Sequence, residues 1–120
     1  MRVSLGSAMA TQDYSRATAR QAAAEILEFM IAGELGLIEG TRQLVDMRHS
    51  LFGHAGNDRN FDRLFEFEAR TNHLPIGRER QEWDPVALAA KDHEIAVAES
   101  EARVEVLSAC RALLSTLRAA

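Results

Sequence analysis

The chain has 120 residues, which is the length of one domain, and its 14 basic and 18 acidic side chains give a formal net charge of −4. That balance supplies no positive field to hold a polyanion, so direct binding to DNA or RNA is not expected. Hydrophobic residues make up 47% and charged residues 27% of the chain, values typical of a globular protein. Twenty alanines against two prolines and six valines favour helix over strand. We therefore expect one all-α domain over residues 1–120.

The cysteine content and the apolar runs bear on cellular location. The single cysteine, Cys110, cannot form a disulfide within the chain and gives no sign of an oxidising compartment. The first ten residues lack the apolar stretch that a secretory signal needs. No apolar run approaches the roughly 18 residues that span a bilayer. These observations predict a cytoplasmic protein without membrane contact.

The first helix is predicted from apolar side chains that recur every three or four residues. It is expected to begin at Asp13 or Ser15, because either side chain can accept hydrogen bonds from the free N–H groups of a first turn. It is expected to end near Gly33, a residue that readily adopts the left-handed conformation found after helices. Residues 1–13 carry no periodic pattern and are expected to be disordered or frayed.

The spacing of apolar residues predicts two further helices. Apolar pairs seven residues apart predict a second helix over about 35–52, despite the glycine at position 40, and this helix should form an αα-hairpin with the first. Residues 54–60 are rich in turn formers and predict a loop. A short third helix is predicted over about 61–70.

The last helix has the clearest start. Residues 71–84 show no sustained period and predict an ordered crossing loop anchored by Trp83. Asp84 can cap a helix and Pro85 suits its first position, where no N–H is needed. No glycine or proline follows, so one helix is expected to run to about Thr116, roughly 45 to 50 Å at 1.5 Å per residue. The fold class is therefore a small bundle of about four helices: a hairpin, a short helix and a long C-terminal helix.

The last helix carries apolar residues on two sides. One stripe is expected to face the core and to pack on the first two helices: Leu88, Ile95, Ala102, Val106, Cys110, Leu113 and Leu117. The opposite stripe consists of Val86, Val97 and Val104. Either the crossing loop over 71–84 covers this second stripe, or the stripe contacts a partner or a second copy of the chain.

The last helix is also the most acidic part of the chain. Five carboxylates accompany one arginine over residues 92–105, and Glu66 and Glu68 on the third helix are expected to extend the surface. The five are Asp92, Glu94, Glu99, Glu101 and Glu105. Two interpretations are open, a solvated helix face or an acidic docking surface for a basic partner.

The sequence contains no strong motif for catalysis, metal binding or phosphate binding. The four histidines never stand four residues apart, there is no cysteine pair, and no glycine-rich phosphate loop follows a strand. Cys110 lies on the predicted core stripe and is expected to be a buried small hydrophobe. No catalytic, cofactor-binding or metal-binding residue is therefore predicted, and the chain is not expected to be an enzyme. The alternative is a small-ligand pocket near Arg80, Trp83, Glu66 and Glu68.

Three segments share the outline of a known group of proteins: an acidic-glycine helix, a Leu-Pro-x-Gly-x-x-Arg-x-x-Trp loop and the start of a long last helix. They are Ile38-Glu39-Gly40-Thr41-Arg42-Gln43-Leu44, Leu74-Pro75-Ile76-Gly77-Arg78-Glu79-Arg80-Gln81-Glu82-Trp83 and Ala87-Leu88-Ala89-Ala90-Lys91-Asp92-His93-Glu94-Ile95. Together they resemble a family of small all-helical bacterial proteins with no assigned reaction, over roughly residues 24–114. Proteins of this kind look like immunity proteins of contact-dependent growth inhibition systems, which bind and neutralise a cognate toxin domain. Residues 52–60 do not follow the pattern, and no functional residue is carried across them.

The resemblance and the charge pattern lead to one main hypothesis. The protein is expected to neutralise a basic toxin domain, such as a nuclease, by stoichiometric binding, because an acidic face complements a basic substrate groove. The alternative is a homodimeric helical adaptor or regulatory protein that uses the valine stripe.

Overall fold

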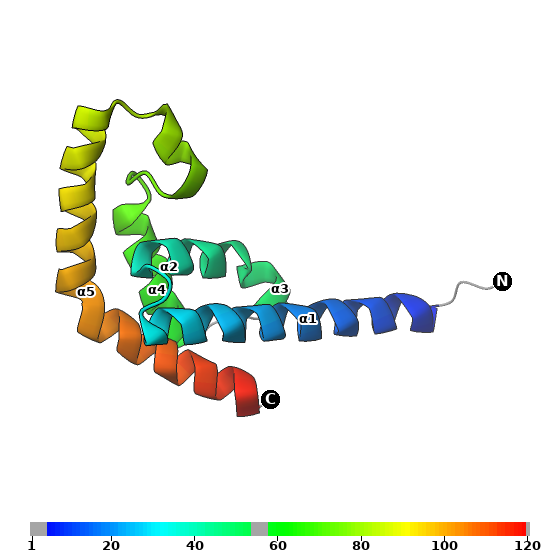
Figure 1. Cartoon of the computed structure of the whole chain (residues 1–120). Helices are drawn as coiled ribbons and strands as arrows, with labels where there is room; N and C mark the ends of the chain where they lie inside the picture. Colours follow the sequence, from blue (N-terminus) through cyan, green and yellow to red (C-terminus); the bar gives the residue numbers. More distant parts are fainter. Residues whose placement is uncertain (1–4, 54–57, 120) are drawn as a thin grey trace.

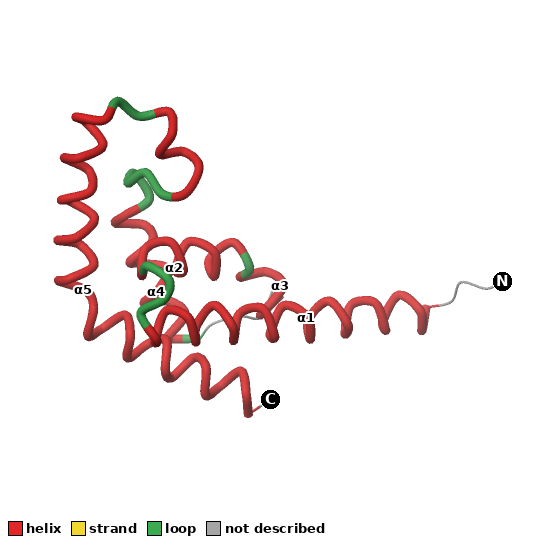
Figure 2. The backbone as a smooth tube through the Cα atoms, viewed as in Figure 1, coloured by secondary structure: helices red, strands yellow, loops and turns green. Residues whose placement is uncertain are grey.

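The structure, a computed structural model, describes residues 5–53 and 58–119, with side chains from residue 16 onward. All regular elements of the described residues are helical, which confirms the all-α prediction (Figure 2). They are α1 (Leu5–Ala32), α2 (Leu37–Asp46), α3 (Arg48–Phe52), α4 (Arg59–Thr71), the 3-10 helix η2 (Gly77–Glu82) and α5 (Pro85–Ala119) (Figure 1).

The α1–α2 hairpin is closed by a glycine turn. Gly33 has a φ of 80° and donates its N–H to the Met30 carbonyl at 3.1 Å, while the Glu34 N–H reaches the Phe29 carbonyl at 2.9 Å. This pair of bonds satisfies two of the last four carbonyls of α1. The predicted helix end at Gly33 is therefore confirmed, and Figure 1 shows α2 returning alongside α1.

The start of α1 differs from the prediction. The helix begins at Leu5 and not at Asp13 or Ser15, so residues 5–13 are helical although they carry no apolar period. Once nucleated, a helix lengthens at low cost through good helix formers, and no proline interrupts this stretch. Figure 1 shows the N-terminal part of α1 extending beyond the other helices.

The predicted second helix is divided in two. At Met47 the N–H bonds to the Leu44 carbonyl at 3.0 Å, a three-residue turn that ends α2 and lets α3 start in a new direction. The turn allows α3 to pack on α1 and buries Leu51. The prediction of one helix over 35–52 was therefore wrong. The error arose because apolar pairs seven residues apart continue on both sides of the turn.

α4 and the segment that follows it close the bundle. Asp58 Oδ1 accepts the N–H groups of Asn60 at 2.8 Å and Phe61 at 3.0 Å, so α4 starts two residues before the predicted helix. Residues 54–57 of the predicted loop lie outside the described residues. The predicted crossing loop contains η2, and its buried anchors are Leu74 and Pro75. They follow α4 directly and reach the core first, whereas Trp83, the expected anchor, is only partly buried and does not belong to the core.

α5 begins as predicted and then bends. Asp84 Oδ2 accepts the N–H groups of Val86 at 3.1 Å and Ala87 at 3.2 Å, with Pro85 at the first helical position. Figure 1 shows α5 changing direction midway. Ala98 and Glu101 line a groove together with residues of α4, and Leu117 and Arg118 line another together with residues of α1. The predicted contact with the first two helices is thus incomplete, because α4 also packs on α5.

The core lies where α1, α2, α4 and α5 meet. Its largest fully buried side chains are Leu27, Met30, Ile38, Leu44, Phe61, Leu64, Phe67, Leu74 and Leu113. Burial of each Leu or Phe side chain contributes about 1.5 to 3 kcal/mol. Of the predicted core stripe on α5, Leu88 and Ile95 are only partly buried, and the other five residues are buried as predicted.

Candidate functional site

The acidic residues of α5 fall into two groups in the structure, and Asp92 belongs to the group that has partners within the chain. Its two carboxylate oxygens accept from Arg80 Nη1 at 2.7 Å and Nη2 at 3.1 Å. These hydrogen bonds, together with the guanidinium charge, lower the pKa of Asp92 against a smaller opposing effect of burial. The pair ties η2 to the first half of α5.

Glu94 is also held within the chain. One of its oxygens lies 2.5 Å from His73 Nε2, and the other accepts from Lys91 Nζ at 3.2 Å. The hydrogen bond from His73, and then the one from Lys91, lower the pKa of Glu94. The segment after α4 is therefore joined to α5 at a second point.

Glu99 has a structural position at the start of α2. Its Oε2 accepts the Ile38 N–H at 2.9 Å, where the N-cap residue Gly36 has no side chain to do so. Carboxylates are favourable there because the first N–H groups of a helix carry partial positive charge. Three of the five carboxylates predicted as a docking surface thus bond within the chain.

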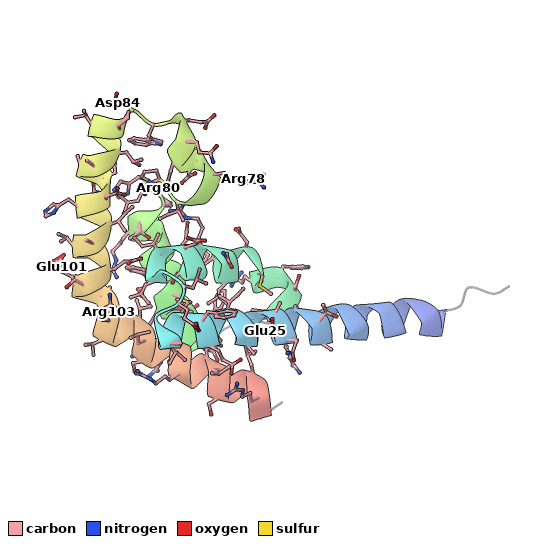
Figure 3. The ribbon with its side chains drawn as sticks, in the orientation of Figure 1. Glu25, Arg78, Arg80, Asp84, Glu101 and Arg103 are labelled. Carbon is pink, nitrogen blue, oxygen red and sulfur yellow. The ribbon has the colours of Figure 1, made fainter. Side chains whose placement is uncertain are left out.

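Glu101 and Glu105 form the second group. Both are exposed, and neither makes an ion pair within the described residues. They line a groove of about 310 Å³ between α4 and α5, together with Phe67, Arg70, Thr71, Ala98 and Ala102. Figure 3 shows Glu101 on the outer side of α5. These two carboxylates remain available to a partner.

The two acidic residues predicted on α4 lie apart from this groove. Glu66 is exposed and Glu68 partly buried, and neither lines the groove that holds Glu101 and Glu105. The alternative of a small-ligand pocket near Arg80 is not supported, because the Arg80 guanidinium is occupied by Asp92 and by the Pro75 carbonyl at 3.4 Å.

The second apolar stripe of α5 is exposed. Val86 is 81% exposed, Val97 42% and Val104 84%. The segment over 71–84 therefore does not cover these side chains, and of the two alternatives for the stripe, burial within the chain is wrong.

One surface was missed by the sequence analysis. A groove of about 620 Å³ lies between the end of α1 and the C-terminal part of α5, and Phe29, 50% exposed, lines it. The sequence did indicate this surface, because Phe29 is an aromatic residue that lies outside the core-facing stripe of the first helix.

Cys110 does not lie on the surface. It is fully buried, and its burial raises the pKa of the thiol to about 12.

Within residues 5–53 and 58–119, no group of three metal-ligating side chains is placed to hold a metal ion. The helices of the same residues include none with the length and apolar character needed to cross a membrane.

Comparisons of the chain with protein-family models, with curated proteins and with solved structures found no match.

Proposed function

We propose that the protein is a binding module that neutralises a basic protein partner through the outer face of α5, formed by Val97, Glu101, Val104 and Glu105. The observation that supports this is the combination of two exposed valines with two carboxylates that have no partner within the described residues. The proposal assigns the protein no reaction, cofactor or metal.

The spacing of these residues makes one continuous surface. Positions 97, 101, 104 and 105 are separated by four, three and one residues, so they lie along one side of a helix. Valines buried on association supply hydrophobic free energy, and carboxylates around them favour a basic partner and speed its approach. A basic substrate groove of a nuclease has the matching charge.

The sequence resemblance supports the same class of function. Immunity proteins of contact-dependent growth inhibition systems act on toxins inside the cell, so we propose a cytoplasmic location and a toxin domain, such as a nuclease, as the partner. Glu66 and Glu68 are peripheral in this proposal, and Asp92, Glu94 and Glu99 shape the face instead of contacting the partner.

A direct test uses the C-terminal domain of the product of the gene adjacent to the one that encodes this chain. Its affinity for the protein is measured by fluorescence anisotropy at several salt concentrations, and protection is scored by growth of cells that produce the domain. We expect Glu101→Lys and Val104→Glu each to weaken binding about tenfold or more, with Glu101→Lys also reducing the salt dependence.

The matched control is Glu82→Lys, which makes the same charge change at an exposed position of η2. It should leave binding close to that of the wild type. Absence of binding and protection by the wild type, or equal losses in the control and in Glu101→Lys, would refute the proposal.

A second candidate, a homodimeric adaptor, is favoured by the exposure of Val86, Val97 and Val104. It predicts a dimer in sedimentation at micromolar concentration without any partner, and Val104→Glu should convert that dimer to a monomer. A wild-type monomer excludes it.

A further inference from the structure

The groove between α1 and the C-terminal part of α5, here the α1–α5 groove, has the geometry of a helix-binding site. Four of its lining residues, Glu25, Glu28, Phe29 and Ala32, stand at positions i, i+3, i+4 and i+7 of α1. Four residues at this spacing enclose the hole into which a side chain of a facing helix inserts in knobs-into-holes packing. Leu114 of α5 contributes to the same groove.

The apolar part of the groove is centred on an aromatic side chain. Phe29 is 50% exposed although its neighbours in α1, Leu27 and Met30, are fully buried. A half-exposed phenylalanine beside a hole is a typical anchor for an interface, because a partner can remove a large apolar area from water there.

The charged side chains that line the groove are all acidic. Glu25, Glu28 and Glu34 line it, and no basic residue does. Glu28 pairs with Arg118, which lines the neighbouring groove, whereas Glu25 accepts from the neutral Gln21 amide at 3.0 Å and has no ion pair in the described part of the chain. Glu34 has no ion pair within the described residues. Two carboxylates at the rim are therefore not neutralised.

We propose that the α1–α5 groove binds an amphipathic helix of another protein, with an apolar side chain inserted beside Phe29 and with Lys or Arg flanking that side chain. The hole on α1 fits a side chain of a helical partner, and the rim carboxylates favour a basic one. A second copy of this chain fits poorly, because its exposed valines on α5 are accompanied by Glu101 and Glu105, which the rim carboxylates would repel.

This site does not depend on the proposed function, because it is built by other residues. The outer face of α5 lies at positions 97–105, whereas the groove is lined by residues of α1, by Glu34 just after it and by Leu114. Loss of one site should leave the other intact.

The test uses a synthetic helix about 20 residues long, roughly 30 Å, with leucines along one face and lysines flanking them. A matched peptide carries glutamates in place of the lysines. Binding is followed by anisotropy of the labelled peptide and by backbone amide shifts of the intact protein in NMR spectra. We expect the lysine peptide to bind, with shifts at Phe29, Ala32 and Leu114, and the glutamate peptide to bind at least about tenfold more weakly.

Variants then identify the residues responsible. Phe29→Ser should lower affinity about tenfold or more, and Glu25→Gln with Glu34→Gln should reduce the salt dependence of binding. The matched control is Phe65→Ser, because Phe65 is 45% exposed on α4 and undergoes the same chemical change away from the groove. Circular dichroism checks that each variant is folded.

Three results would overturn the proposal. The first is equal affinity for the two peptides, which would show apolar adsorption without charge selection. The second is a set of amide shifts confined to residues 97–105, which would place the basic helix on the outer face of α5. The third is a dimer in sedimentation that Phe29→Ser dissociates, which would make a second copy the occupant.

Discussion

Glu99 of α5 accepts the backbone N–H of Ile38 at 2.9 Å, a hydrogen bond between residues 61 positions apart that supplies α2 with a cap from another helix. Gly36, the N-cap of α2, leaves room for this contact, because a Cβ there would lie 3.3 Å from the Glu99 carboxylate. The centre of the acidic helix therefore has a structural role beside any role in binding.

Loss of this cap should destabilise the fold. We expect Glu99→Ala to lower the free energy of unfolding by about 1 to 2 kcal/mol, as for other helix caps, and Glu99→Gln to lower it less because the amide oxygen can still accept. Urea unfolding measures both values. Glu101→Ala, two positions away and without an ion pair within the described residues, is the control and should change stability by less than about 0.5 kcal/mol. Equal losses in Glu99→Ala and Glu101→Ala would contradict the capping role.

Gly40 stands inside α2 because the α1–α2 hairpin is tightly packed there. A Cβ at this position would overlap the side chain of Met30, which is itself buried. Alanine favours a helix over glycine by about 1 kcal/mol, but overpacking of a core costs about 1 to 3 kcal/mol. We expect Gly40→Ala to be destabilising by urea unfolding, against its helix propensity.

A double-mutant cycle with Met30→Ala isolates the cause. Removal of the Met30 side chain opens space for the new methyl group, so Gly40→Ala should cost less, or stabilise, in that background. The same cost in both backgrounds would show that the contact with Met30 does not explain the glycine.

Thr41 and Thr71 provide a matched pair of buried hydroxyl groups. Thr41 Oγ1 is buried without a hydrogen-bond partner among the described residues, whereas Thr71 Oγ1 donates to the Phe67 carbonyl at 2.8 Å. Valine has nearly the same shape and no hydroxyl, so Thr41→Val should raise the free energy of unfolding by about 1 kcal/mol by removing an unpaired polar group. Thr71→Val should lower it by about 1 kcal/mol. Thermal unfolding of the two variants should therefore shift in opposite directions, and shifts of one sign would contradict this assignment.

These packing relationships mark the limit of prediction from sequence. Gly33 acts through its own backbone, and Asp84 acts through a side chain that accepts from N–H groups two and three residues along, so the end of α1 and the start of α5 could be predicted. The turn at Met47 could not, because the apolar spacing continues past it and packing of α3 on α1 decides the direction.

The candidate site was predicted less well than the fold. The sequence shows which residues are acidic, but the availability of each carboxylate depends on partners that the fold brings from elsewhere, such as Arg80 for Asp92 and Ile38 for Glu99. Only contacts between distant elements separate Glu101 and Glu105 from the other three. The exposure of Val104 likewise follows from where the segment over 71–84 lies, which the sequence left open.

The ion pair between Arg80 and Asp92 should make stability depend on pH in the acid range. The pKa of Asp92 is lowered in the folded protein, so the pair stabilises the fold above the unfolded pKa of about 3.9 and this stabilisation is lost as the pH falls through the lower folded pKa. We expect Asp92→Asn to lower stability at neutral pH and to reduce the loss of stability below about pH 4. Urea unfolding across this range measures the slope. A wild-type slope in Asp92→Asn would contradict the prediction.

Cys110 should report on opening of the core. Burial raises the pKa of its thiol to about 12, against about 8.5 for a free cysteine, so at about pH 8 the reactive thiolate is on the order of a thousandfold rarer than in an unfolded chain. We expect a thiol reagent such as DTNB to modify the native protein very slowly and the urea-unfolded protein at once. Modification then requires the protein to open, so the rate should rise in proportion to the unfolded fraction. The Gly40→Ala variant should accordingly be labelled faster than the wild type, and Thr41→Val more slowly. Rapid labelling of the native wild type, independent of these changes in stability, would show that the thiol reaches solvent without opening of the core between α1 and α5.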